Sequence, residues 1–221
     1  MNEQPNAGAT VAVYHHGDLP NALLDAVAVL VEEKGSAAVS LREVARRAGV
    51  SHSAPAHHFG DKEGMLAAFS VRGYDILSAM MRDALSASSD RDGIERLAAV
   101  GAAYVTFAIE HVAYFDVMFR SGIDKEAYED LRDSAYATMD MLLEAVSQLI
   151  SEKGLVGADL RIVAMYFWSL AHGLASLAVD GSMPPTMQEL PIADYIVGVF
   201  SMSSLVLRTS VLPSGGTAEE R

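Results

Sequence analysis

The sequence predicts an all-α protein of about nine helices. In nearly every segment of the 221 residues, apolar side chains recur at intervals of three and four, which places them on one face of a helix. No segment shows the strict alternation of apolar and polar residues that is typical of a half-buried strand. Glycine, serine and proline residues interrupt this pattern and divide the chain into separate helices.

A first helix is expected from Asp18 to Lys34. Gly35 follows the last apolar repeat and ends the helix, because glycine is common just past a helix C-terminus. The side chains expected to face inward are Leu23, Ala26, Val27, Leu30 and Val31.

A short second helix is expected over residues 41–48. Ser40 can cap its N-terminus, and the apolar residues that follow lie on one face while Arg42 points toward solvent. Gly49 ends this helix, since glycine accepts the positive φ that such a stop commonly uses. A tight turn must therefore separate it from the next segment.

A third, very short helix is expected to begin with Ser51 as its cap. Pro55 falls in or near its first turn, where the missing N–H of proline costs least. The outward positions are small or can form hydrogen bonds, as a surface that reads base edges and phosphates requires. These positions are His52, Ser53, Ala56 and His57.

Helical spacing continues to the end of the chain. Further helices are expected at 61–85, 90–110, 112–119, 124–153, 159–179 and 186–207. The helix from residue 61 joins the N-terminal helices to the body, and Gly73 is a candidate flexible point in it. The segment 124–153 fits nine turns or a broken pair, and Pro191 falls early in the last helix. The apolar stripe of the joining helix comprises Met65, Leu66, Phe69, Ile76 and Met80.

From about Leu19 to Ala68, the chain resembles the DNA-binding domain of the tetracycline-repressor (TetR) family of transcriptional regulators. The resemblance is strongest in Ser40-Leu-Arg-Glu-Val-Ala45, Ala48-Gly-Val-Ser51 and His58-Phe-Gly-Asp-Lys-Glu63. It implies a three-helix helix-turn-helix domain over residues 18–63, followed by a helical ligand-binding and dimerisation domain over 64–208. Residues 1–17 and 209–221 lack amphipathic order and are expected to be mobile arms.

The resemblance also assigns roles in binding a double-stranded DNA operator. It makes Ser51 to His57 the recognition helix in the major groove and Lys62 a phosphate ligand. One residue departs from the family pattern: Ala56 stands where the family usually has tyrosine, so one phosphate contact is lost. The residues expected to contact DNA are Ser40, Arg42, Ser51, His52, Ser53, His57, His58 and Lys62.

The charge distribution agrees with this assignment. The chain carries a net charge of −13, but residues 40–62 contain four basic and two acidic side chains and are net positive. The flanking segments 1–39 and 63–221 carry −4 and −11. Charges within about a Debye length of the phosphates, roughly 8–10 Å, matter most, so an acidic body held away from the duplex is compatible with DNA binding.

The C-terminal half resembles a large TetR subgroup in its Trp-Ser-x-x-His-Gly-Leu-Ala pattern, which begins at Trp168. In this family the last two helices pair with those of a second subunit as a four-helix bundle, which implies a homodimer. Two recognition helices about 34 Å apart would then meet successive major grooves of an approximately palindromic operator.

Large, soft side chains in the central helices suggest a pocket for a small apolar or aromatic effector. The alternative for each of them is ordinary core packing, and for the histidines a packed or helix-capping role. The residues expected at the pocket are Tyr104, Phe107, His111, Met118, Phe119, Tyr136, Met139, Trp168 and His172.

The sequence gives little support for a metal site, an enzyme or a membrane protein. No metal site is expected, since His52, His57 and His58 lack metal-ligand spacing and no Asp or Glu completes a cluster. The chain has no phosphate loop, no Gly-x-Ser-x-Gly and no His-Glu-x-x-His, so neither an enzyme nor a cofactor is expected. It also has no cysteine, no run of 18 apolar residues and no signal-peptide pattern, which is compatible with a cytoplasmic protein that does not act in a membrane.

These observations favour a ligand-responsive, sequence-specific regulator of transcription, most simply a repressor that the effector releases from its operator. The alternative is a ligand-binding dimer with weak or lost DNA binding, which Ala56 and the acidic body suggest.

Overall fold

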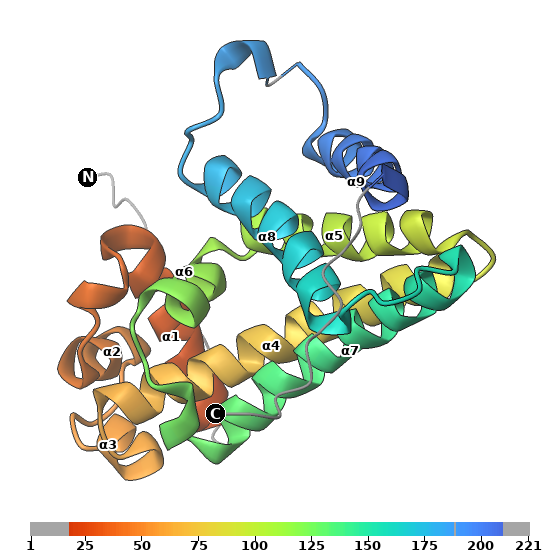
Figure 1. Ribbon diagram of the computed structural model, residues 1–221. Helices are drawn as coiled ribbons and strands as arrows, with labels where there is room; N and C mark the ends of the chain where they lie inside the picture. Colours follow the sequence, from red (N-terminus) through yellow and green to blue (C-terminus); the bar gives the residue numbers. More distant parts are fainter. Residues whose placement is uncertain (1–17, 188, 210–221) are drawn as a thin grey trace, which may run out of the picture.

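The computed structural model describes residues 18–187 and 189–209, and within these ranges it contains helices and no strand (Figure 1). The prediction of an all-α fold of about nine helices is confirmed. The expected N-terminal arm 1–17 lies outside the described residues, as does the expected C-terminal tail from residue 210. The α-helices are α1 (Leu19–Lys34), α2 (Leu41–Ala48), α3 (Ala54–Phe59), α4 (Lys62–Ala87), α5 (Gly93–Glu110), α6 (Val112–Arg120), α7 (Glu129–Lys153), α8 (Leu160–Val179) and α9 (Ile192–Thr209). Three short 3-10 turns are η1 (Ser36–Ala38), η2 (Lys125–Ala127) and η3 (Pro185–Met187).

Helices α1, α2 and α3 gather at one end of the long helix α4 (Figure 1). Every apolar residue predicted to face inward on α1 is buried. Ser40 caps α2 as predicted, since its hydroxyl accepts a hydrogen bond from the Glu43 backbone N–H at 3.3 Å. Gly49 adopts the left-handed conformation, with a φ of 70°, and ends the helix.

Helix α3 begins later than predicted, with Ser53 rather than Ser51 at the cap position. Residues 51–53 form a turn in which the Ala54 N–H donates to the Ser51 carbonyl at 3.1 Å. The reason lies in Pro55, which is buried in the first turn of α3. If Ser51 were the cap, position 55 would have to donate its N–H to the Ser51 carbonyl, and proline has no such proton.

Helix α4 belongs to both halves of the molecule. Asp61 caps its N-terminus by accepting from the Gly64 N–H at 2.8 Å, and the helix continues two residues beyond the predicted end. Its first turns place Met65, Leu66 and Phe69 in the core of the N-terminal helices. Farther along, the predicted Ile76 and Met80 pack against the core but are only partly buried. The fully inward residues there are Tyr74, Leu77 and Met81.

Gly73 is a site of close packing rather than the expected flexible point. A Cβ at this position would lie 2.5 Å from the Met118 sulfur and 3.1 Å from the Tyr114 ring. The absence of a side chain lets α6 approach α4 closely, and the aromatic ring of Tyr114 stacks on Phe69 at 4.2 Å.

The C-terminal helices pack around α5 and extend the hydrophobic core. Helix α7 lies along α4, while α8 and α9 pack on α5 (Figure 1). The segment 124–153 is broken rather than continuous, since η2 precedes α7. Helix α9 begins six residues later than predicted, directly after Pro191, which has no N–H to donate within a helix and disfavours the helical conformation of the residue before it.

Helix α8 is apolar on two faces. One face is buried and includes Val163, Phe167 and Ala175, whereas the other exposes 55% of Met165 and 46% of Leu177. By length and composition α8 would suffice to cross a membrane, as would α5 and α6 together if their 103° bend were straightened. The same length and composition are also found in helices that lie between the core of a protein and a partner subunit.

We expect Gly73→Ala to lower the free energy of unfolding by about 1–2 kcal/mol, although alanine favours a helix more than glycine does. The added methyl group must displace Met118 or Tyr114. Chemical denaturation of Gly73→Ala, Met118→Ala and the double variant measures the effect. The loss of unfolding free energy caused by Gly73→Ala should be smaller in the Met118→Ala background than in the wild type. Equal losses in both backgrounds would show that a clash with Met118 is not the cause.

Candidate functional site

The exposed surface of α2, α3 and the turn between them carries the residues predicted to read DNA. Ser51, His52, Ser53, His57 and His58 are all exposed. The two serine hydroxyls lie 3.3 Å apart, and the rings of His57 and His58 meet edge to face at 5.4 Å. The surface therefore offers hydroxyl and imidazole groups at the free end of the N-terminal helices, which suits hydrogen bonding to bases and phosphates.

Arg42 is the arginine of this surface that is free to bind phosphate. Arg46 pairs with Glu43 at 2.7 Å, and Arg47 pairs with Glu33 at 2.7 Å. Arg42 is exposed and pairs with none of the acidic side chains that the structure describes. Because Arg46 donates to it, Glu43 has a pKa lowered to about 2, so its charge persists at any physiological pH. The net positive charge of the surface depends strongly on Arg42.

Lys62 has a structural contact that the sequence did not predict. Its ammonium group donates to the Ala37 carbonyl at 3.0 Å and so holds η1 against the start of α4. An ammonium group has three N–H donors, and the contact uses one of them. Lys62 can therefore fix η1 and bind a phosphate at the same time.

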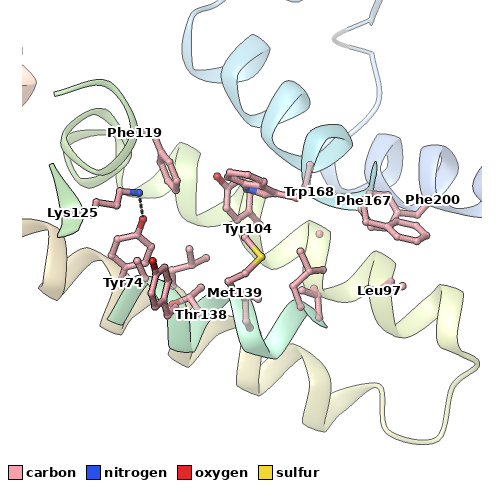
Figure 2. Close-up of a pocket in the computed structure, with 18 residues that line it drawn as sticks. Tyr74, Leu97, Tyr104, Phe119, Lys125, Thr138, Met139, Phe167, Trp168 and Phe200 are labelled. Carbon is pink, nitrogen blue, oxygen red and sulfur yellow. Dashed lines mark hydrogen bonds between the residues drawn. The ribbon is translucent and has the colours of Figure 1, made fainter. Parts of the chain in front are cut away.

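A cavity of about 230 Å³ lies among α4, α5, α7, α8 and α9 (Figure 2). This volume is just below the range of roughly 300–1,000 Å³ found for small-molecule sites. The walls are apolar apart from a few hydroxyl groups and one lysine. The lining residues are Tyr74, Leu77, Met81, Leu97, Val100, Gly101, Tyr104, Phe119, Lys125, Ala135, Tyr136, Thr138, Met139, Leu142, Phe167, Trp168, Ala171 and Phe200.

Five of the nine residues predicted at a pocket line this cavity. They are Tyr104, Phe119, Tyr136, Met139 and Trp168.

The other four lie off the wall. Phe107 is buried in the core, and Met118 is buried where α6 meets α4. His111 occupies the break between α5 and α6, where its ring packs against that of Phe107 at 5.5 Å. His172 supports the wall from behind, because its Nδ1 lies 2.7 Å from the Tyr104 hydroxyl. Helical spacing correctly placed these side chains inward, but it could not distinguish the core from the cavity.

The most informative lining residue that the sequence did not reveal is Lys125. Its ammonium group donates to the Tyr74 hydroxyl at 2.6 Å (Figure 2). Burial lowers the pKa of Lys125 and raises the pKa of the Tyr74 hydroxyl. Burial also lowers the pKa of His172, with smaller effects in the same direction from Arg120 and Lys125, so this histidine is uncharged at neutral pH. A lysine in a short 3-10 turn has no periodic pattern from which its direction could be predicted.

Besides the Lys62 contact, two further polar contacts among the described residues join the N-terminal helices to α4 and α6. Arg72 of α4 pairs with Asp25 of α1 at 2.7 Å. The Ser36 backbone N–H donates to Asp116 of α6 at 3.4 Å. These contacts connect α1 and η1 with α4 and α6.

Two family models match this chain. Residues 23–75 match the model described as bacterial regulatory proteins of the tetR family. Residues 97–198 match the model described as the tetracyclin repressor-like C-terminal domain. The chain belongs to the TetR family of transcriptional regulators. It is therefore an all-α, DNA-binding regulator of a family that is not enzymatic.

Individual relatives agree with this assignment. The chain is 26% identical over 191 residues to the HTH-type transcriptional regulator YobS of Bacillus subtilis (strain 168), covering 86% of this chain and 94% of YobS. It is 35% identical to BetI of Rhizobium meliloti (strain 1021) over 96 residues, which cover 42% of this chain and 46% of BetI.

Solved structures show the same fold. A protein of unknown function from Rhodococcus sp. RHA1 has a TM-score of 0.72 and 30% identity, covering 90% of this chain and 98% of that one. The regulator PfmR of Thermus thermophilus has a TM-score of 0.63 and 21% identity, covering 84% of this chain and 97% of PfmR. The resemblance identified in the sequence thus extends to both halves of the chain, whereas no finding identifies the Trp-His-Gly subgroup.

We expect Arg42→Ala and Lys62→Ala each to weaken DNA binding about tenfold. Each should also reduce the slope of the logarithm of the binding constant against the logarithm of the salt concentration by about one. Each change removes one positive charge from the DNA-binding surface. Mobility-shift titration at low and moderate salt, with DNA from directly upstream of the protein's own gene, measures both effects.

Arg82→Ala is the matched control, because Arg82 is an exposed arginine near the far end of α4. It should leave DNA affinity unchanged. Equal weakening by all three changes would show that total charge, rather than these two positions, controls binding.

Proposed function

We propose that this TetR-family regulator is a repressor that a small, mostly apolar effector releases from a palindromic operator. The main support for the proposal is that α4 extends from the DNA-reading helices to the cavity. This helix contributes Met65 and Phe69 to the core beneath the DNA-reading surface and contributes Tyr74, Leu77 and Met81 to the cavity wall. A molecule in the cavity would touch the same helix that supports the DNA-reading helices.

The proposed mechanism is a shift between two arrangements of α4. Without effector, the two reading surfaces of a dimer lie at operator spacing. An effector that fits the cavity better after α4 has moved would stabilise a spacing that no longer matches the operator. The Arg72–Asp25 and Asp116–Ser36 contacts would transmit the displacement to α1 and η1. Repression by occluding polymerase is the simplest output of such a protein, and its site of action is the cytoplasm.

The proposed subunit partner is a second copy of this chain, bound through α8 and α9. On α8, Met165 and Leu177 are exposed, and on α9 Val197 and Met202 are 48% and 67% exposed. Gly173 and Gly198 have open space at their Cβ positions, so a neighbouring helix can approach closely. We assign residues 18–63 to DNA reading and 64–208 to effector binding and dimerisation, with the Trp168 to Ala175 segment as that of the Trp-His-Gly subgroup.

Effector release can be tested with a panel of small apolar and aromatic compounds. Binding is followed by the fluorescence of Trp168, the single tryptophan of the chain, which lines the cavity. At least one compound that binds should lower the occupancy of operator DNA in the mobility-shift assay. If compounds that bind the cavity all leave DNA affinity unchanged, the proposal of effector release is wrong.

A cavity-filling variant provides the control for the site of action. Ala135→Trp on α7 should occupy the cavity and abolish the response to the compound, because Ala135 lines the wall. Ala137→Trp, two residues away on the exposed face of the same helix, should retain the response. If the protein binds no DNA even at low salt, the alternative of a ligand-binding dimer that has lost its operator is favoured.

We expect Met202→Glu to dissociate the homodimer and to weaken operator binding at least about tenfold, since a carboxylate would be buried between two apolar faces. Sedimentation velocity measures the subunit state. Val156→Glu is the matched control, because Val156 is fully exposed between α7 and α8. A dimer that survives Met202→Glu would place the interface elsewhere.

A further inference from the structure

Lys125 is the one charged side chain among the described residues that line the cavity. It extends from η2, between α6 and α7, and reaches the space between Tyr74 and Phe119 (Figure 2). Its nitrogen lies 5.2 Å from the centre of the Tyr74 ring and 5.1 Å from the centre of the Phe119 ring. Two aromatic faces and a hydrogen bond to Tyr74 therefore hold the ammonium group at the cavity.

No carboxylate in the described part of the chain pairs with Lys125. The neighbouring Glu126 accepts a hydrogen bond from the Tyr136 hydroxyl at 2.5 Å. Partial burial disfavours the charged form of Lys125, and an anion beside the ammonium group would offset this effect. None of the described carboxylates balances the charge of Lys125 at the cavity, so an anion from outside the chain would have this role.

The other hydroxyl groups of the cavity wall already have partners within the protein. The Tyr74 oxygen accepts from Lys125, which leaves the proton of its hydroxyl available for an acceptor in the cavity. Lys125 and Tyr74 thus present two donors side by side. The hydroxyls already engaged are those of Tyr104 with His172 and Trp168, Tyr136 with Glu126, and Thr138 with Ser134.

The cavity is polar at one end and apolar at the other. Figure 2 shows Lys125 and Tyr74 at one end, with Leu97, Phe167 and Phe200 at the opposite end. A ligand that satisfies both ends needs an apolar body and a single polar head. The head must accept two hydrogen bonds and carry a negative charge.

We propose that the effector is an amphipathic monocarboxylate, whose carboxylate binds Lys125 and the Tyr74 hydroxyl and whose apolar body extends toward Phe167 and Phe200. The inference rests on the proposed role of this cavity as the effector site. A carboxylate accepts both donors in charge-assisted hydrogen bonds, which are stronger than neutral ones. A cation would be repelled by Lys125, and a neutral compound would leave the ammonium group without its counter-ion.

Octanoate and octanamide provide the test, since they differ in little besides the charge of the head group. Their affinities are measured with the purified full-length protein by the fluorescence of Trp168. Octanoate should bind at least about tenfold more tightly than octanamide. Lys125→Met should remove this preference, and Lys125→Arg, which keeps the charge, should retain it.

Lys153→Met is the matched control, because Lys153 lies at the end of α7 and pairs with Asp92 at 3.5 Å. It should leave the preference for octanoate unchanged. Equal affinity of the two compounds for the wild type, a preference that survives Lys125→Met, or no saturable binding of octanoate would each overturn the inference.

DNA release is measured separately, so the two proposals can fail independently. If octanoate binds with the expected preference but does not release operator DNA, the carboxylate inference holds and the proposed repressor mechanism is wrong. If neutral compounds release DNA while octanoate and octanamide bind equally, the repressor mechanism holds and the carboxylate inference is wrong.

Discussion

The structure depends on the burial of one continuous helix that packs against both halves of the molecule. Helix α4 has 26 residues and is therefore about 39 Å long, at 1.5 Å per residue. Phe69 is fully buried near its start, and Leu77 and Met81 are buried beyond its middle. Between them Gly73 lets α6 pack closely. Because the same helix packs against the DNA-reading helices and lines the cavity, it is the element through which the proposed effector response would pass.

Charge separates the molecule into parts with different partners. The segment 40–62 is net positive, and the ion pairs of Arg46 and Arg47 occupy two of its three arginines, which leaves Arg42 outward. The body carries most of the negative charge and would be repelled by DNA if it came near. Lys125 differs from both, since it lies beside an apolar cavity, donates to the Tyr74 hydroxyl and pairs with none of the described carboxylates.

Helix α8 has two apolar faces, one buried and one exposed. Phe167 and Ala171 line the cavity on one side, while Met165 and Leu177 are exposed on the other. The wall of the proposed effector site is thus the back of the proposed dimer interface. This arrangement allows a ligand to influence the subunit contact as well as α4, because both surfaces belong to the same helix.

The sequence by itself determined the features that depend on local chemistry. Periodicity identified the helices, and Ser40 and Gly49 marked the ends of α2 through capping and positive φ. Local chemistry also underlies the misplaced starts of α3 and α9, since Pro55 and Pro191 restrict where a helix can begin. Only the tertiary structure decided which inward side chains form core and which face a cavity. Periodicity gives the direction of a side chain but not what lies opposite, so Phe107 and Phe119 look alike in sequence. Lys125 could not be predicted at all, because its place beside Tyr74 arises from a contact between segments 51 residues apart.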